Sequence, residues 1–224
     1  MIARGRMTAC VRNPPTRILV LGFVATLWSA YAAGGEPVGD ATRGAVVAQA
    51  CAVCHGKLGE GNFPLGYPRL AGQTENYLRK QLEDFVTGRR SNPLMDAITR
   101  MYNEQQRADA AAYYASRSAP YAPAGAPADP RLLARGRLLV RTGDEARQLQ
   151  ACANCHGPDG SGEDFAGPCL VGQSATYVVN VLNEWKSGAR NNDGGRQMQV
   201  VATRLDEKDA AAVAAYAESL GHAK

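Results

Sequence analysis

Residues 51–56 of this chain read CAVCHG, and residues 152–157 read CANCHG. In each stretch two residues separate a pair of cysteines, and a histidine follows the second cysteine directly. The chain holds three histidines in all, so two of the three belong to this pattern. A motif that recurs in nearly the same form indicates a duplicated unit.

The similarity between the two halves extends well beyond these motifs. The segment LAGQTENYLRKQLEDFVTGRRSN (70–92) aligns without gaps with LVGQSATYVVNVLNEWKSGARNN (170–192), and AAYYAS (111–116) returns as AAYAES (214–219). Because the matches follow one another in the same order in both halves, they indicate duplication of a whole domain rather than of one motif.

A stretch rich in proline and alanine separates the two halves. Residues 118–130 read SAPYAPAGAPADP and lack periodic spacing of apolar residues, which is typical of a linker. The sequence therefore predicts an N-terminal domain over 34–117 and a C-terminal domain over 131–224. Each domain is small for a stable core, so we expect an embedded prosthetic group to supply much of the buried apolar surface.

Both halves have the pattern of helices. Apolar residues recur at helical spacing in several segments, and polar or acidic residues begin the alanine-rich ones, as helix N-termini prefer. The segments predicted to form helices are 41–50, 74–88 and 103–116 in the first half, and 130–140, 174–188 and 205–220 in the second. Strand-like alternation is missing. We therefore predict an all-α fold in which one domain occurs twice.

The first 33 residues have the composition of an export signal peptide. Arginines without any acidic residue lead into the short apolar stretch ILVLGFVATLW (18–28), and small residues follow it. We expect residues 1–33 to be cleaved during export. The mature protein would then lie in an oxidising, extracytoplasmic compartment.

The formal net charge of +4 does not indicate a nucleic-acid partner. The arginines of residues 1–33 account for the entire excess, so the mature chain is close to neutral. Binding of nucleic acid would need a basic patch on the mature protein. The chain also lacks a run of about 18 apolar residues, which a polytopic membrane protein would need.

Several kinds of site use two cysteines separated by two residues. A zinc ribbon needs its two pairs about 15–20 residues apart, and here most of a domain separates them. A thioredoxin-like redox motif needs a βαβ context, and a plain disulfide does not need the histidine. Covalent haem attachment needs all three residues, because two thiols add to the vinyl groups of one porphyrin and the histidine becomes the proximal iron ligand.

The sequence therefore predicts two covalently attached haem c groups. The residues predicted to hold them are Cys51, Cys54 and His55 in the first half, and Cys152, Cys155 and His156 in the second. Cys169 lies outside both pairs, and we interpret it as a small buried residue.

The second axial ligand is expected to be methionine, whose soft thioether suits low-spin haem iron. Met198 is the one methionine of the second half, whereas the first half offers Met95 and Met101. Met198 lies seven residues before Leu205, which opens the last predicted helix, and Met95 lies seven residues before Tyr102, the counterpart of Leu205, so the repeat favours Met95 over Met101. His222 is close to the C-terminus, and we interpret it as a solvated tail residue.

Pro68 and Pro168 follow the two histidines at similar distances, in the loops GYPRLAGQ and AGPCLVGQ. We expect a backbone carbonyl at each proline to accept a hydrogen bond from the histidine Nδ1–H. Such a bond would fix the orientation and the tautomer of the ring.

With these motifs in place, the sequence resembles the dihaem cytochrome c4 family, exported proteins built from two class I cytochrome c domains. The resemblance rests on both cysteine–histidine motifs, both proline loops and the turns GRRSNP and GARNND, and it covers essentially the whole mature chain. It implies a periplasmic shuttle that moves one electron per haem. It also implies His–Met ligation, through His55 and Met95 at one iron and through His156 and Met198 at the other.

Three functions are compatible with these features. The first is an electron carrier, soluble or loosely associated with a membrane, that is not an enzyme and connects a cytochrome bc1-type complex or a dehydrogenase with a terminal oxidase. The second is the dihaem subunit of an exported dehydrogenase, such as a flavoprotein that oxidises sulfide. The third is a haem peroxidase or thiosulfate oxidase, which would need an open iron. We favour the carrier, because we expect ligands on both faces of each iron.

Overall fold

The computed structural model describes residues 36–121, 128–162 and 167–222. The predicted export signal, residues 1–33, lies outside these ranges. The helices of the first half are α1 (Ala41–His55), α2 (Glu75–Thr87), α3 (Pro93–Arg100) and α4 (Glu104–Ala115). The helices of the second half are α5 (Pro130–Thr142), α6 (Ala153–His156), α7 (Ala175–Ser187), α8 (Gln197–Thr203) and α9 (Glu207–Ser219).

The prediction of an all-α fold is confirmed. The described residues form no β-strand; their β-type pairing consists of isolated bridges, which include Asn62–Tyr67 and Asp144–Leu149. Each of the predicted helical segments overlaps a helix of the structure, namely α1, α2, α4, α5, α7 or α9. In the same part of the chain, no helix combines the length and the apolar character needed to cross a membrane.

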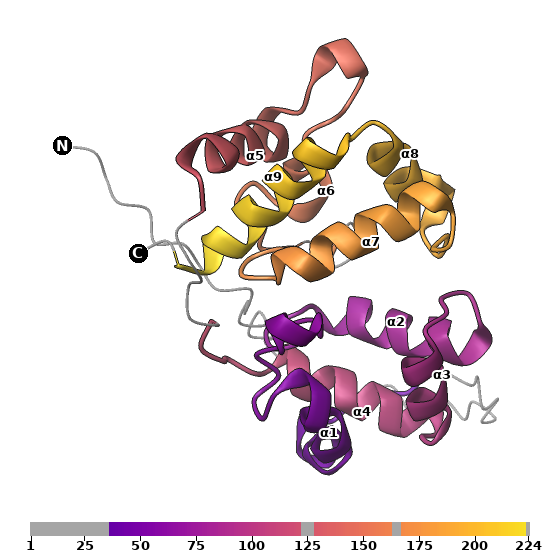
Figure 1. The fold of residues 1–224 in the computed structure, drawn as a ribbon. Helices are drawn as coiled ribbons and strands as arrows, with labels where there is room; N and C mark the ends of the chain where they lie inside the picture. Colours follow the sequence, from indigo (N-terminus) through magenta and orange to yellow (C-terminus); the bar gives the residue numbers. More distant parts are fainter. Residues whose placement is uncertain (1–35, 122–127, 163–166, 223–224) are drawn as a thin grey trace, which may run out of the picture.

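Figure 1 shows the helices gathered in two units, α1–α4 and α5–α9, with α2 and α7 facing one another between them. In the first unit α1 packs against α4, and in the second α5 packs against α9. The linker predicted over 118–130 connects the units, and its described residues carry no helix before Pro130. The duplication in sequence is therefore visible as a repeated arrangement of helices. The domain boundaries 34–117 and 131–224 stay predictions.

Each of the two long helix pairs crosses at a glycine. A Cβ atom on Gly44 would come within 2.0 Å of the carbonyl oxygen of Asp109, and one on Gly136 would come within 2.0 Å of the carbonyl oxygen of Ala212. Backbones can approach this closely only where no side chain stands between them. Small residues fill the rest of the contact, which explains why α4 and α9 are rich in buried alanine.

A buried carboxylate ties the helices together beside each crossing. Arg43 on α1 donates hydrogen bonds to both carboxylate oxygens of Asp109 on α4, each at 2.8 Å. Arg135 on α5 donates to both oxygens of Asp209 on α9, at 2.7 and 2.9 Å. The Arg43 hydrogen bonds are the chief reason that the pKa of Asp109 falls to about 2. The ion pairs therefore add an electrostatic component to the glycine contacts.

The two halves differ in how the chain reaches the cysteine–histidine motif. Helix α1 continues through the whole first motif, whereas α5 ends at Thr142 and a loop precedes α6. An Asp144–Leu149 bridge closes this loop, and Arg147 ties it to Asp209 of α9. This loop is thus held in place by the same buried carboxylate that joins α5 to α9.

Hydrophobic periodicity does not predict α3 or α8, because both helices are too short for an apolar stripe to repeat. Local signals at the start of α3 explain why it forms. The Asn92 side chain accepts hydrogen bonds from the N–H groups of Leu94 and Met95, and Pro93 occupies the first helical position, where its missing N–H costs nothing.

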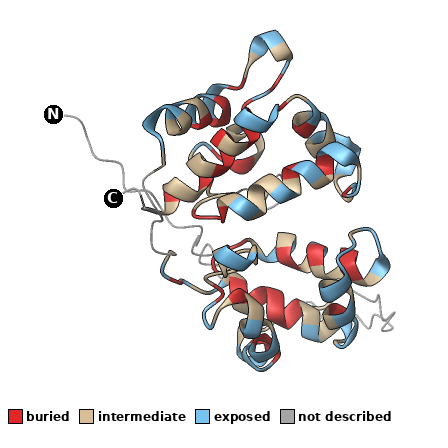
Figure 2. Cartoon of the chain, viewed as in Figure 1, coloured by how far each residue is buried: buried red, intermediate tan, exposed pale blue. Residues whose placement is uncertain are grey.

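The cores of the two units differ in size. Figure 2 shows buried residues gathered on the inner sides of both units. The buried cluster of the second unit consists of Leu139, Val140, Leu149, Leu182, Trp185, Ala202, Leu205, Ala210 and Val213. The cluster of the first unit consists of Ala48, Leu78, Ala111 and Tyr114. The first unit in particular depends on more than its own apolar side chains for a complete core.

Side chains on and just after α2 and α7 meet in two reciprocal pairs. Arg90 donates to the hydroxyl of Tyr177 at 3.1 Å, and Arg190 donates to the hydroxyl of Tyr77 at 3.3 Å. Each residue of one pair is the repeat counterpart of a residue in the other pair. The two units therefore face each other across an approximate two-fold axis, as two copies of one surface do in a symmetric dimer.

Candidate functional site

The first cysteine–histidine motif occupies the last turns of α1. Cys51 and Cys54 lie one turn apart, so their side chains project from the same face of the helix. Both are half-buried, with free thiols. His55 is 7% exposed, and the helix ends at Gly56, whose φ of +85° is unfavourable for other residues. The motif thus presents two thiols and one buried imidazole together.

The second motif has the same local arrangement on the short helix α6. Cys152 directly precedes the helix and Cys155 lies within it, and both are half-buried with free thiols. His156 is 8% exposed, and Gly157 follows it with a φ of +80°. The two motifs therefore agree in local geometry, although the chain reaches them by different routes.

A proline carbonyl binds each histidine. The Nδ1 of His55 lies 2.9 Å from the carbonyl oxygen of Pro68, and the Nδ1 of His156 lies 2.8 Å from that of Pro168. A carbonyl oxygen can only accept, so Nδ1 carries the proton and Nε2 keeps its lone pair. The predicted role of the proline carbonyls is confirmed, and each ring has the tautomer that a metal ligand at Nε2 requires.

Burial determines the protonation of the motif side chains. It lowers the pKa of His55 and of His156, so both imidazoles are neutral at physiological pH. Burial also raises the pKa of the Cys51 thiol, and it raises that of Cys152 to about 11. Within the protein chain itself, these two cysteines are therefore thiols rather than thiolates.

The methionines differ in exposure. Met95 lies on α3 and Met198 on α8, and both are half-buried. Met198 packs against the same hydrophobic cluster as Cys152. Met101 follows the end of α3 and is 75% exposed. An iron ligand must lie inside the protein, so exposure favours Met95 over Met101, as the repeat does. The ligand roles of Met95 and Met198 stay predictions.

The surroundings of the two histidines are not identical. The ring of Tyr67 meets the ring of His55 edge-on, with 6.0 Å between centroids. The repeat counterpart of Tyr67 is Gly167, where a Cβ atom would come within 2.9 Å of the Nδ1 of His156. An aromatic ring therefore lies beside one imidazole, whereas the backbone of Gly167 closely approaches the other.

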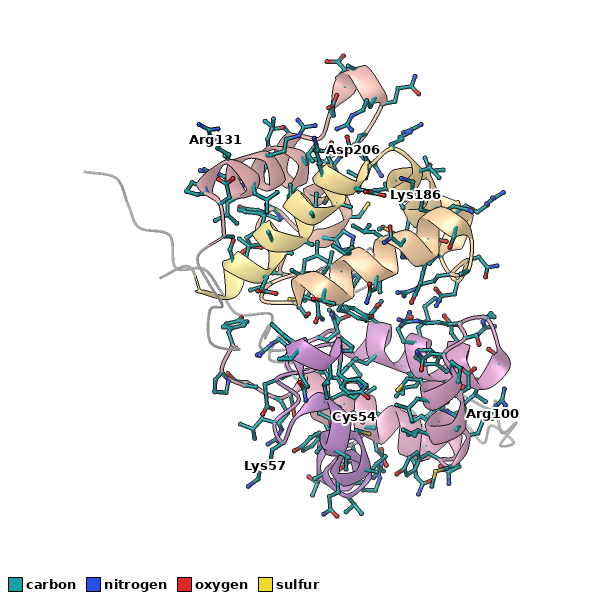
Figure 3. The ribbon with its side chains drawn as sticks, viewed as in Figure 1. Cys54, Lys57, Arg100, Arg131, Lys186 and Asp206 are labelled. Carbon is teal, nitrogen blue, oxygen red and sulfur yellow. The ribbon has the colours of Figure 1, made fainter. Side chains whose placement is uncertain are left out.

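The residues of both motifs suit a covalently bound haem. Two thiols, a neutral imidazole with a free Nε2 and a half-buried thioether form the donor set of haem c. Beside Cys54, an open pocket of about 360 Å³ is lined by residues 52–54, by Gly56 and by residues 60–64; its lining does not include Cys51, His55 or Met95. Figure 3 shows Cys54 within the first unit, whereas the exposed Lys57 points away from it.

Sequence reasoning assigned no role to Gln73 and Gln173, although both repeats carry them. In the structure each side chain is 7% exposed and reaches across to the other unit. Gln73 binds the backbone of Cys169, and Gln173 binds the backbone of Arg69. Cys169 itself is buried, as expected. The identity of these glutamines in both repeats was the only sequence signal for their contacts.

The family model of cytochrome c matches this chain twice, over residues 41–118 and 140–221. Among curated relatives, cytochrome c4 of Pseudomonas aeruginosa is 42% identical over 184 residues, which are 81% of this chain and 89% of the relative. The thiosulfate dehydrogenase electron acceptor of Stutzerimonas stutzeri (strain A1501) is 37% identical over 202 residues, which are 89% of this chain and 93% of the relative.

Two solved structures have the same arrangement of helices. Reduced recombinant cytochrome c4 from Pseudomonas stutzeri matches with a TM-score of 0.74 at 36% identity, over 81% of this chain and 98% of that chain. Thiosulfate dehydrogenase from Marichromatium purpuratum matches with a TM-score of 0.73 at 38% identity, over 80% of this chain and 40% of that chain.

Proposed function

Because this chain belongs to the cytochrome c family, and within it to the dihaem cytochromes c4, we propose that it carries single electrons through the periplasm. The donor would be an exported dehydrogenase or a cytochrome bc1-type complex, and the acceptor a terminal oxidase. The coarser prediction is confirmed: the protein is a dihaem c-type electron-transfer cytochrome with two covalently attached haem c groups.

We assign each haem to the residues of one repeat. The first haem would be held by Cys51, Cys54, His55 and Met95, and the second by Cys152, Cys155, His156 and Met198. The observation that carries the assignment is the state of the two histidines. Each is buried beside two thiols, with its Nδ1–H donated to a proline carbonyl and its Nε2 free.

The haem supplies one-electron oxidation and reduction, and the chain determines how easily these occur. The proline carbonyls make each imidazole a more basic ligand, whereas methionine sulfur raises the reduction potential. Ligands on both faces of the iron leave no position for a substrate. We therefore assign the protein no catalytic turnover.

Two similarities support a dehydrogenase as the electron donor. The Stutzerimonas stutzeri relative is named as an electron acceptor of thiosulfate dehydrogenase. In the Marichromatium structure, a region similar to this chain is part of a longer thiosulfate dehydrogenase chain. A second candidate function follows, in which this chain is the permanent haem subunit of an exported dehydrogenase. Co-purification with a second polypeptide at constant ratio would favour the subunit over the mobile carrier.

The periplasmic location rests on the predicted signal peptide over residues 1–33. Cleavage is expected to remove this segment during export, which places the mature protein in an extracytoplasmic compartment. Mass spectrometry of the protein purified from a periplasmic fraction tests this point, since it gives the mature N-terminus and the added mass of the haems together.

Optical spectroscopy of the purified holoprotein tests the carrier function. We expect two haems per chain, the weak far-red band of methionine-bound ferric haem in the oxidised state, and no change when carbon monoxide is added to the reduced state. A carbon monoxide adduct at one haem would show an open iron. That result would reject His–Met ligation at that site and would favour a haem enzyme.

A further inference from the structure

We propose that Gln73 and Gln173 are positioning residues that set the axial histidine of the opposite domain. Gln173 of the second unit would act on His55, and Gln73 of the first unit would act on His156. The proposal rests on the axial roles assigned above to the two histidines. It goes further, because it makes the properties of each haem depend on a side chain of the other domain.

The contact of Gln173 with the first unit consists of two hydrogen bonds to one residue. Its Oε1 accepts from the backbone N–H of Arg69 at 2.9 Å, and its Nε2 donates to the carbonyl oxygen of Arg69 at 3.1 Å. This is the pairing that a neighbouring β-strand would offer. It holds the backbone of Arg69 in one orientation and does not involve its side chain.

Gln73 makes the equivalent contact with the second unit, related to the first by the approximate two-fold axis. Its Oε1 accepts from the N–H of Cys169 at 2.7 Å, and its Nε2 donates to the carbonyl oxygen of Cys169 at 3.1 Å. Arg69 and Cys169 occupy equivalent positions but differ completely in side chain. The glutamines are identical because they bind backbone, and the residues that they bind are free to differ.

A single peptide group connects each glutamine to a histidine. The N–H of Arg69 and the carbonyl of Pro68 belong to the same planar peptide unit, so neither can turn without the other. Gln173 binds the N–H end of this unit, and His55 donates its Nδ1–H to the carbonyl end at 2.9 Å. The peptide between Pro168 and Cys169 is bound in the same way by Gln73 and His156.

Hydrogen bonds at the two ends of a peptide group strengthen each other. Acceptance of the N–H by a glutamine oxygen makes the carbonyl a better acceptor for the imidazole. A stronger Nδ1–H bond in turn makes Nε2 a more basic ligand, which favours ferric over ferrous iron. Loss of Gln173 is therefore expected to raise the potential of the His55 haem, and loss of Gln73 that of the His156 haem.

The remaining contacts of the glutamines give a competing expectation. Gln73 Oε1 also accepts from the N–H of Thr74 in its own unit, and Gln173 Oε1 also accepts from the N–H of Ser174. If these local bonds were the important ones, each substitution would affect the haem of its own domain. The two explanations thus predict effects on opposite haems.

The test uses the holoprotein variants Gln173→Met and Gln73→Met, which keep side-chain volume and remove the hydrogen bonds. Redox titration followed by NMR, with the ring signals of each histidine assigned, gives the potential of each haem separately. We expect Gln173→Met to shift the His55 haem by about threefold in its redox equilibrium constant, below the tenfold or greater effect of a direct partner. At 59 mV per tenfold, this is about 28 mV.

The imidazole proton provides a second readout. In the reduced protein, exchange of the His55 Nδ1–H with solvent should become faster in Gln173→Met, and that of the His156 Nδ1–H in Gln73→Met. Gln173→Glu keeps an acceptor for the Arg69 N–H, so the His55 haem should stay at or below its wild-type potential. If Gln173→Met does not fold, Gln173→Glu is the variant in which the potential of the His55 haem is measured.

Tyr177→Phe is the matched control, because it removes the Arg90 contact across the same interface without touching either proline loop. The proposal is overturned if the methionine variants shift the haem of their own domain, shift both haems equally, shift neither, or do no more than Tyr177→Phe. The carrier function is judged separately, on the wild-type spectrum. An altered ligand signature there would reject the axial assignment before any glutamine variant is made.

Discussion

Gly44 and Asp109 are in backbone contact where α1 crosses α4, and a Cβ atom on Gly44 would come within 2.0 Å of the Asp109 carbonyl oxygen. Neither backbone can move without separating the two helices. The cysteine–histidine motif lies at the end of α1. This contact fixes where α1 packs along α4, and with it the position of the motif in the core of the first unit.

We expect Gly44→Ala to destabilise the holoprotein by about 3 kcal/mol, the upper range for overpacking, because the clash is with backbone and no flexible side chain can yield. Gly136→Ala should have the same effect in the second unit, where the nearest atom is the Ala212 carbonyl oxygen. Denaturant unfolding gives the free energies. Gly194→Ala is the control, since nothing lies within 4 Å of its Cβ position, and a change within about 0.5 kcal/mol is expected. Equal effects of all three variants would contradict the close crossing.

The Asp109 carboxylate should make stability depend on acid pH. Its folded pKa of about 2 lies below the unfolded value of about 3.9. Its contribution is therefore fully present above about pH 4 and is lost as pH falls toward 2. Because the Arg43 side chain is 56% exposed, we expect Asp109→Asn to cost only about 1 kcal/mol at neutral pH.

A double-mutant cycle checks this assignment. Unfolding free energies of Asp109→Asn, Arg43→Met and the double variant are compared at pH 7 and at pH 2.5. The effects should be strongly non-additive at neutral pH, because both substitutions remove the same ion pair. Additive effects at pH 7, or a decline below pH 4 that persists in Asp109→Asn, would show that other carboxylates carry the acid sensitivity.

The methionine assignments can be separated from each other by spectroscopy. Met95→Ala and Met198→Ala should each remove about half of the far-red band of the oxidised protein, since each would leave one haem without its thioether. Met101→Ala should leave the whole band, because that side chain is 75% exposed. Loss of intensity in Met101→Ala and its retention in Met95→Ala would reverse the assignment in the first domain.

Most of the fold and the chemical motifs could be predicted from sequence because both depend on local patterns. The cysteine–histidine spacing predicts haem attachment, and the distance from His55 to Pro68 predicts the carbonyl that binds the ring. The repeat supplied a check that a single domain lacks, because Met95 could be chosen over Met101 by its register with Met198. Residues that act within a few turns of one another are accessible to such reasoning.

The parts that sequence did not predict depend on short or long-range structure. Helix α3 is specified by the Asn92 cap and Pro93 rather than by an apolar stripe, so periodicity does not detect it. The contact of Gln173 with Arg69 joins residues of different domains. Its geometry follows from how the two units pack, and the repeat indicates only that this glutamine occurs twice.

The interface itself gives the last prediction. Arg190 is 4% exposed, donates to Gln81 at 2.8 Å and to the Tyr77 hydroxyl at 3.3 Å, and lies 4.6 Å from the ring centroid of Trp185. Lysine cannot reproduce the planar fork, so Arg190→Lys would lose the hydrogen bonds to Gln81 and Tyr77 and the stacking on Trp185, at a cost of about 2 kcal/mol. Arg131→Lys, at an exposed helix start that points away from the interface (Figure 3), is the control.

Denaturant unfolding should show a single transition for wild type and a broader one, with a smaller slope, for Arg190→Lys, because the two domains then unfold less cooperatively. An unchanged slope and midpoint would mean that this interface does not couple the folding of the two domains.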